Sequence, residues 1–267
     1  MENPRSFTLP RTYTRKMLRA IREFDLIQPG DRVLVGLSGG KDSSFLLYAL
    51  SVFQKHQIIP FTLGALTVDL GFDAAFPMHR LADYCQRLGV AFHTLQTEIA
   101  KYAFSEDNPE GPCATCSFLR RGAMNRFARE HDYNVIALAH HHDDAVETFL
   151  MSIIYSGQMK TFLPRTTLER SGLTVIRPLV YFREAEIRKS VPLTGFTPVT
   201  SPCPRDGQTK RAETKRLIRE LCRHDEMIFS HLAAAMREGR PRELWPAELS
   251  REEIRRRNLG ESKSTAR

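Results

Sequence analysis

Long apolar runs are absent from this sequence of 267 residues. No stretch approaches the roughly 18 apolar residues of a membrane-spanning helix, and residues 1–6 lack the apolar core of a signal peptide. We therefore expect a cytoplasmic protein with no membrane partner. The sequence is nevertheless 42% hydrophobic, which is enough to bury a substantial core and excludes a wholly disordered chain.

Cysteine is scarce as well, and its five residues are an odd number. Without a secretion signal, this count argues against a disulfide scaffold and favours free thiols, metal ligands or catalytic groups. Cys85 and Cys222 lie within amphipathic helical patterns, and we expect both to be buried thiols. Cys113, Cys116 and Cys203 remain as candidates for chemistry.

Acidic residues are missing from residues 5–22, a segment rich in arginine and lysine. Residues 210–223 and 251–257 are also basic, and the whole chain has 39 Lys and Arg against 31 Asp and Glu, a formal charge of +8. Such clusters suit a polyanion, because each neutralised phosphate releases counterions. A solvated helix face is the alternative for any one cluster, so charge alone leaves a nucleic-acid partner open.

Hydrophobic periodicity predicts strands that alternate with helices. The predicted strands cover residues 32–37, 60–68, 91–95, 134–139 and 173–176. The predicted helices cover residues 11–24, 44–53, 77–88, 116–130, 143–155 and 183–189, with one or two more within 209–237 whose apolar face is Leu217, Leu221, Ile228 and Leu232. This order predicts an α/β fold: a doubly wound, mostly parallel sheet with helices on both faces.

We divide the chain into four predicted segments, which are a basic N-terminal helical segment (1–27), an α/β domain (28–200), a cysteine-containing loop with C-terminal helices (201–246) and a basic, flexible tail (247–267). Ligands of open α/β sheets bind at the carboxyl ends of the strands. We therefore expect the functional site in the loops that follow Leu37, Val68 and Ala139.

The loop after the first predicted strand combines two glycines with hydroxyl, ammonium and carboxylate groups, in the order Ser38, Gly39, Gly40, Lys41, Asp42 and Ser43. Glycines allow a tight turn and a close approach of the backbone to a ligand, and amides at a helix start form an anion cradle. Lys41 adds positive charge, whereas the carboxylate of Asp42 suits a Mg²⁺ ion. The loop matches neither the Walker pattern nor G-x-G-x-x-G, and a glycine turn with a helix cap is the structural alternative.

This hexapeptide resembles the PP-loop of ATP-pyrophosphatases, and residues 139–144 resemble the G/A-H-x-x-D-D element of the same superfamily. The resemblance implies an adenine nucleotide α-hydrolase-like fold that binds ATP and Mg²⁺, cleaves ATP between the α and β phosphates and adenylates a carbonyl oxygen. It implies a nucleotide site at three strand ends, formed by Ser38, Gly39, Gly40, Lys41, Asp42, Ser43, Val68, Asp69, Ala139, His140, Asp143 and Asp144. A favourable helix start is the alternative role for Asp143 and Asp144.

Cys113 and Cys116 form a C-x-x-C motif in front of a predicted helix that carries Arg120 and Arg121. Taken alone, this motif fits a redox dithiol, half of a zinc site or part of an iron–sulfur site. Cys203 adds a third thiol, and three thiolates suit a [4Fe-4S] cluster that keeps one iron open for a reactant.

Residues 113–122, C-A-T-C-S-F-L-R-R-G, resemble the C-x-x-C-S-x-L-R-R-G element of the tRNA 2-thiocytidine synthetases. The resemblance covers about residues 25–246, and its other elements are Arg177-Pro178-Leu179, Arg183-Glu184 with Ile187, and Pro202-Cys203. Family members often carry another cysteine three residues after the position of Cys203, where this sequence has Asp206. This difference leaves a divergent subgroup open.

Membership of this family would imply ATP-dependent thiolation at C2 of a cytidine, at position 32 of the anticodon loop, with a [4Fe-4S] cluster held by Cys113, Cys116 and Cys203. The groups implied to act on the reactants are Lys41, Asp42, Arg120 and Asp144. The implied partners are tRNA and a sulfur donor such as a cysteine desulfurase, and we expect residues 11–24 and 210–223 to contact tRNA phosphates.

Three other functions remain open at this point. The chain also fits a PP-loop enzyme of another specificity, similar to a 2-thiouridine synthetase or a lysidine synthetase, and a non-catalytic iron–sulfur protein that binds RNA. The modified nucleotide, the sulfur donor and the oligomeric state stay open too, a homodimer included.

Overall fold

The computed structural model describes residues 7–72, 76–205, 207, 209–238 and 248–258. It divides into two units, residues 1–236 and residues 237–267. The described part of the second unit contains helix α10 (Arg251–Asn258), which begins after a cap in which Glu253 N donates to Ser250 Oγ at 3.2 Å. The four predicted segments remain predictions, and Asp206 and residues 259–267 lie outside the described residues.

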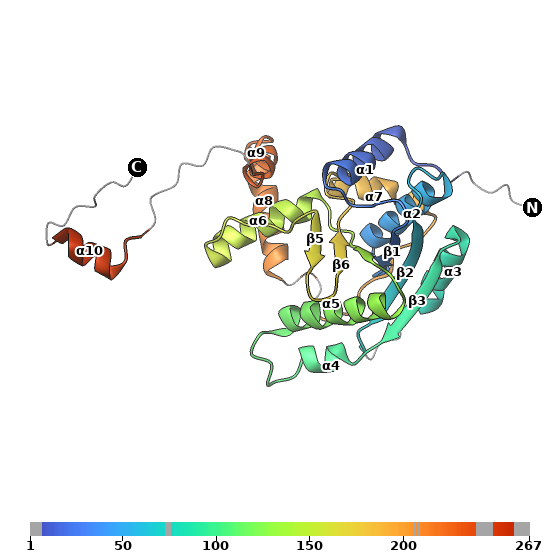
Figure 1. Cartoon of the computed structure of the whole chain (residues 1–267), viewed down its shortest axis with the longest axis horizontal. Coiled ribbons are helices and arrows are strands. Elements are labelled where there is room, and N and C mark those ends of the chain that lie inside the picture. The colour runs from blue at the N-terminus through green and yellow to red at the C-terminus, as the bar shows by residue number, and fades with distance from the viewer. Residues whose placement is uncertain (1–6, 73–75, 206, 208, 239–247, 259–267) are drawn as a thin grey trace, which may run out of the picture. The chain divides into compact units, whose positions relative to one another are not determined.

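A six-stranded sheet forms the centre of the first unit, with the strand order β3-β2-β1-β4-β6-β5 (Figure 1). The strands are β1 (Arg32–Gly36), β2 (Thr62–Asp69), β3 (Ala91–Gln96), β4 (Val135–Ala137), β5 (Arg165–Leu168) and β6 (Leu173–Ile176). Every neighbouring pair is parallel except β5 with β6, which is antiparallel. The predicted doubly wound, mostly parallel sheet is therefore confirmed.

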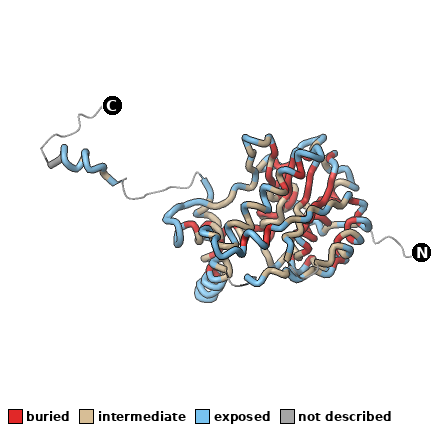
Figure 2. The backbone as a smooth tube through the Cα atoms, turned by 90° about the horizontal axis from the view of Figure 1, so that it is seen from below, coloured by how far each residue is buried: buried red, intermediate tan, exposed pale blue. Residues whose placement is uncertain are grey.

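Helices cover both faces of this sheet, because successive side chains of a buried strand point to opposite sides. Val33 and Val35 of β1 belong to one core cluster, whereas Leu34 belongs to another. The first cluster includes residues of α1 (Arg11–Glu23), α2 (Lys41–Lys55), α3 (Met78–Leu88) and α7 (Glu184–Thr194). The second cluster includes residues of α5 (Pro112–Glu130), beside which lies the short α4 (Ile99–Ala103). Figure 2 shows the buried residues, in red, gathered inside the first unit, with exposed residues around them.

The C-terminal helices of the first unit are α8 (Lys210–His224) and α9 (Ile228–Ala235), and both contact α6 (His142–Ser156). Their shared core cluster contains Val146, Ile218 and Phe229. The apolar face predicted for α8 is wrong, because Leu217 and Leu221 are 42% and 36% exposed. The inward face follows positions four apart around Ile218 instead, and it includes Cys222, which is only partly buried rather than the buried thiol we expected.

Several element boundaries differ from the predictions for local reasons. Helix α2 begins at Lys41, three residues early, because Gly40 serves as its N-cap. Helix α5 begins at Pro112, since proline is well suited to the first helical position. Helix α7 continues to Thr194 and ends where Gly195 adopts a left-handed conformation. The prediction missed α4 and β5, which are too short to show a periodic pattern.

The polarity of the sheet places the candidate site. The chain runs from β1 to β2 and β3 on one side and then crosses to β4 on the other, so the gap between the carboxyl ends of β1 and β4 is the switch point of the sheet. The hexapeptide follows β1, and residues 138–144 follow β4. Among the described helices, none combines the length and apolar character needed to cross a membrane.

Candidate active site

The phosphate loop has the backbone geometry of an anion site. Gly39 has a φ of +79°, and a Cβ atom there would lie 3.1 Å from the ring of Phe76, so the position requires glycine. Val199 N donates to Gly39 O at 2.9 Å and fixes the loop from the far side. Gly40 is the N-cap of α2, whose first amide N–H groups have no carbonyl one turn back and are available to an anion.

The two serines of the loop mainly hold its shape. Ser38 N donates to Ser43 Oγ at 3.1 Å, the two hydroxyl oxygens lie 3.0 Å apart, and Ser43 Oγ donates to Gly40 O at 3.2 Å. The pair therefore links the end of β1 to the first turn of α2, and it keeps the amide cradle in place.

Asp42 presents a carboxylate oxygen that is left without a hydrogen bond. Its Oδ2 accepts from Lys41 Nζ at 2.9 Å, whereas its Oδ1 is buried without a hydrogen-bond partner in the described residues. The nearest cationic candidate for Oδ1 is His141 Nε2, at 3.8 Å. A buried carboxylate oxygen without a partner is costly, and Mg²⁺ prefers such ligands, so Asp42 fits a magnesium ion. No described group of three or more His, Cys, Asp or Glu side chains is arranged to hold a metal ion by itself, and phosphate oxygens of ATP would have to complete the coordination.

The two aspartates after β4 have different surroundings. Asp144 forms a capping box at the start of α6, in which His141 N donates to Asp144 Oδ2 at 2.9 Å and Asp144 N donates to His141 Nδ1 at 3.3 Å. Asp143 instead binds Arg183 Nε at 3.1 Å and accepts from Glu184 N at 2.8 Å. The helix-start role is therefore present for Asp144, and Asp143 connects α6 to the start of α7.

Glu184 belongs to the site, although no role was predicted for it. Its carboxylate lies between two ammonium groups, with Lys41 Nζ at 3.1 Å and Lys215 Nζ at 2.6 Å. Burial alone would raise the pKa of Glu184, but Lys215 and Lys41 lower it to about 2. The pKa of Lys41 is raised, because Asp42 and Glu184 outweigh the opposite effect of burial. Lys41 is therefore charged and held between two carboxylates at the edge of the phosphate loop.

The basic helix α8 also contributes to the same site, while its contacts with tRNA phosphates remain a prediction. Arg211 Nη1 lies 3.6 Å from Asp144 Oδ1 and 3.4 Å from Glu147 Oε2, and Arg211 Nη2 donates to Thr148 at 3.1 Å. Together with Lys215, it turns one face of α8 toward the acidic groups of α6 and α7. The acidic residues explain this orientation, because their charge needs compensation away from water.

Glu147 provides a test of the electrostatics of this region. Burial and Asp144 raise its pKa to about 7, against the opposing effects of Lys215 and Arg211. A raised carboxyl pKa stabilises the fold fully below the unfolded value of 4.5 and loses that contribution as the pH rises through about 7. We therefore expect the free energy of unfolding to fall between about pH 5 and pH 8, by on the order of 3 kcal/mol at most.

Glu147→Gln should remove this loss, because the amide stays neutral at every pH. Urea unfolding of both proteins at about pH 5 and pH 8 measures it, and the variant is expected to be the more stable protein only at the higher pH. An equal pH dependence in the two proteins would contradict the electrostatic account of Glu147.

The remaining predicted nucleotide residues lie at the strand ends as expected. Asp69 ends β2, and its Oδ1 accepts from Gly71 N at 3.0 Å, so its side chain is engaged in the local turn. Val68 packs against the core cluster under α5, whereas Ala139 packs against the cluster on the opposite face. These positions place backbone and apolar groups at the carboxyl ends of β2 and β4.

The three candidate cysteines lie close enough to influence one another. Cys113 is exposed, and Cys116 and Cys203 are half-buried. Burial raises the pKa of Cys116, Arg120 lowers it, and Cys203 and Cys113 raise it further. Cys203 belongs to the loop that Val199 attaches to the phosphate loop. Three thiolates are the type of donor that holds an iron–sulfur cluster.

His140 connects the cysteines to the acidic groups. Burial lowers its pKa to about 4, Asp144 opposes this change, and Arg177, Arg211 and Arg120 reinforce it. Arg120 therefore lowers the pKa of both His140 and Cys116. The structure thus brings the C-x-x-C helix, the β4 loop and the phosphate loop together at the carboxyl ends of the strands.

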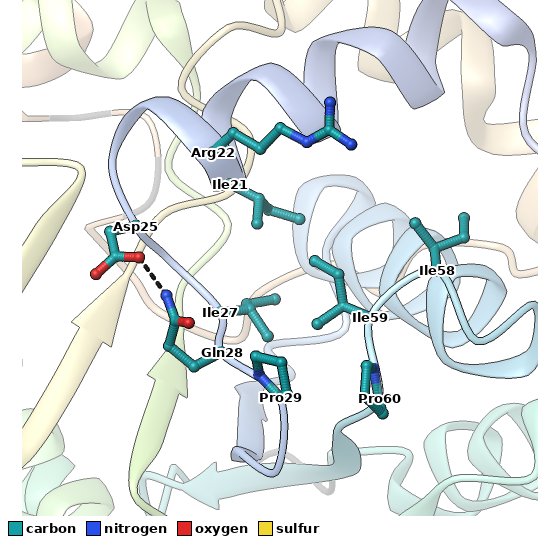
Figure 3. A pocket seen from close by; sticks show the side chains of 9 residues that line it. All are labelled: Ile21, Arg22, Asp25, Ile27, Gln28, Pro29, Ile58, Ile59 and Pro60. Carbon is teal, nitrogen blue, oxygen red and sulfur yellow. Dashed lines mark hydrogen bonds between the residues drawn. The ribbon is translucent and has the colours of Figure 1, made fainter.

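A pocket lies at the amino-terminal ends of the strands, opposite the candidate site (Figure 3). Its volume is about 370 Å³, and its walls include Pro29 and Pro60, which precede β1 and β2. Arg22 and the hydrogen-bonded pair Asp25 and Gln28 also line it. None of the predicted site residues lines this pocket, and ligands of open α/β sheets bind at the other end of the strands.

Known proteins share both the sequence and the fold. The family model of the PP-loop domain matches residues 10–221. The tRNA-cytidine(32) 2-sulfurtransferase of Geobacter metallireducens is 34% identical over 236 residues, which cover 87% of this chain and 91% of the relative. The protein of that name from Anaeromyxobacter dehalogenans is 37% identical over 247 residues, which cover 89% of this chain and 84% of the relative.

A solved structure agrees with the fold. The U34-tRNA thiolase NcsA from Methanococcus maripaludis, solved with its [4Fe-4S] cluster, superposes with a TM-score of 0.69 at 21% sequence identity. The match covers 84% of this chain and 78% of that chain. At this identity the likeness concerns the fold alone, whereas the sequence relatives define the family. The chain therefore belongs to the PP-loop family and, within it, to the tRNA-cytidine(32) 2-sulfurtransferases.

Proposed function

We propose that this chain is an ATP-dependent tRNA thiolase that replaces the C2 oxygen of a cytidine, at position 32 of the anticodon loop, with sulfur. The observation that carries the proposal is the hydrogen bond of 2.9 Å between Val199 N and Gly39 O. It attaches the loop of Cys203 to the phosphate loop, so groups suited to ATP and groups suited to sulfur chemistry share one site. The names and sequences of the relatives support tRNA as the substrate.

The first chemical task is activation of a poor leaving group. The C2 oxygen attacks the α phosphate of ATP, the bond between the α and β phosphates breaks, and pyrophosphate leaves. Lys41 and the amides at the start of α2 stabilise the negative charge on the phosphates, and Asp42 would hold a Mg²⁺ ion, which would supply further electrostatic stabilisation of that charge. Glu184 keeps the ammonium of Lys41 in place at 3.1 Å, so that little reorganisation is needed during the reaction.

The second task is transfer of sulfur to the activated carbon. A [4Fe-4S] cluster held by Cys113, Cys116 and Cys203 would supply a position for sulfide, which has the oxidation level of the sulfur in the product. A donor such as a cysteine desulfurase provides persulfide sulfur, which a thiol reductant would first reduce to sulfide. The carbon–sulfur bond forms at C2, and AMP leaves with the former C2 oxygen. Arg120 lowers the pKa of both Cys116 and His140, and its positive charge stabilises the departing phosphate. Holding both reactants in one site lowers the entropic cost of the transfer.

Mass spectrometry of tRNA nucleosides tests this function directly in cells. A strain that lacks the gene for this chain is expected to lose 2-thiocytidine and to keep its other thiolated nucleosides, because the other nucleosides have their own enzymes. A plasmid copy of the wild-type gene should restore the modification. An unchanged nucleoside profile, or the loss of a different thionucleoside, would contradict the proposal.

A further inference from the structure

Arg177 directly follows β6, and its guanidinium is only partly satisfied. Its Nη1 donates to Leu163 O at 2.6 Å, and the guanidinium lies 5.0 Å from the centroid of the Phe162 ring. Its Nε is buried and has no hydrogen-bond partner among the described residues. A buried donor without an acceptor costs free energy, so a ligand that accepts a hydrogen bond would explain the position of this group.

The groups around Arg177 add positive charge instead of compensating for it. Burial and the neighbouring Arg121 of α5 lower the pKa of Arg177 to about 10. No ion pair in the described part of the chain joins either arginine to a carboxylate. His140, whose ring lies 5.1 Å from that of Phe162, also has a buried Nδ1 without a partner. Arg177 and His140 thus lie beside Phe162 with unpaired polar atoms, and Arg121 adds positive charge nearby, so the region is chemically suited to an anion.

The surroundings favour an RNA strand over a small free anion. Phe118 is 70% exposed and lies three residues before Arg121, on the same face of α5. Phe162 also lines a pocket of about 390 Å³ whose walls include Lys160 and Lys210. An exposed aromatic ring beside positive charge is what a single-stranded nucleic acid uses for stacking and phosphate contacts. Free pyrophosphate would use neither the ring nor the pocket, and the phosphate loop already offers it a cradle.

We propose that Arg121 and Arg177 together bind a backbone phosphate of the RNA strand that carries the target nucleotide, beside Phe162. This inference rests on the proposed function and deepens it, since it assigns a contact for the substrate outside the ATP site. The phosphate accepts hydrogen bonds from the guanidinium groups of Arg177 and Arg121. Arg120 adjoins Arg121 on α5, the helix that also carries Cys113 and Cys116. A strand bound at Arg121 therefore lies near these cysteines.

Arg121→Gln tests this contact, with Arg129→Gln as the matched control because both arginines are exposed on α5. Binding of tRNA to the full chain is measured over a series of salt concentrations, and ATP binding is measured separately. We expect Arg121→Gln to weaken tRNA binding several-fold and to reduce the slope of log K against log salt by about 0.7–1, the loss of one phosphate contact. Arg129→Gln and ATP binding should remain at wild-type values.

Arg177→Lys gives an independent measurement, since it keeps the charge but removes the Nε donor. Its effect should be less than additive with that of Arg121→Gln, because both residues bind one phosphate. An Arg121→Gln variant with the affinity and slope of Arg129→Gln would overturn the inference. So would weaker ATP binding with unchanged tRNA binding, which would assign the anion to the nucleotide. Wild-type protein that binds no tRNA would overturn the proposed function as well, and this outcome is distinct from the others.

Discussion

Asp42→Asn is expected to reduce thiolation by at least roughly 10²–10³-fold, the usual loss when one preorganised group that stabilises transition-state charge is removed. The reason is the buried Oδ1 of Asp42, which has no hydrogen-bond partner in the described residues and therefore suits a magnesium ion. An amide has the same shape but a much weaker affinity for Mg²⁺. Formation of AMP and pyrophosphate in the presence of tRNA measures the first chemical step, and nucleoside analysis measures the second.

Asp83→Asn is the matched control, because Asp83 is exposed on α3, away from the phosphate loop. It should leave both reactions unchanged. The melting temperature of Asp42→Asn should stay close to that of the wild type, since the substitution removes one ion pair with Lys41, while Lys41 keeps its other partner Glu184. If Asp42→Asn retained wild-type turnover, the assignment of Asp42 to magnesium would be wrong.

Cys203→Ala is expected to remove both the iron–sulfur group and thiolation. Anaerobic reconstitution followed by iron and sulfide analysis measures the first effect, and nucleoside analysis measures the second. ATP binding should persist, because the link between Val199 and Gly39 is made by backbone atoms that the substitution leaves in place. The variant thus separates the sulfur chemistry from the nucleotide site.

Cys222→Ala is the control for this experiment, since Cys222 packs beside the small cluster of α6, α8 and α9. It should keep iron, sulfide and thiolation. Retention of a full cluster by Cys203→Ala would exclude Cys203 as a ligand. Loss of the cluster from Cys222→Ala in a folded protein would assign the ligands differently.

Much of this architecture could be predicted from residue patterns, and the phosphate loop shows why. Gly39 and Gly40 follow a buried strand and precede a helix, so their position along the chain already indicates a turn at the edge of a sheet. A local feature of this kind can be recognised from residues that are neighbours in the sequence. Three elements were missed. Helix α10 lies in the segment predicted as a flexible tail. Elements α4 and β5 are too short to have a period, and β5 forms only because it pairs with β6.

The contacts made by α8 could not be predicted, because they join residues far apart in the chain. Lys215 reaches Glu184 and Arg211 reaches Glu147, whereas the sequence showed only a run of basic residues. A basic run does not reveal which of its members pair with acids until the acids are placed around it. The prediction that Leu217 lies on the buried face of α8 is wrong for a related reason. The acidic site attracts a polar face of α8, which turns Leu217 toward solvent.

The most direct test of the account is sulfur transfer in a defined mixture. The mixture would contain reconstituted protein, ATP, Mg²⁺, a sulfide source and a tRNA transcript with cytidine at position 32, and the tRNA would be digested for nucleoside mass spectrometry. The account predicts 2-thiocytidine at position 32, formed in equal amount with AMP and absent when ATP is omitted. Formation of 2-thiocytidine without ATP, or consumption of ATP without thiolation of that cytidine, would contradict it.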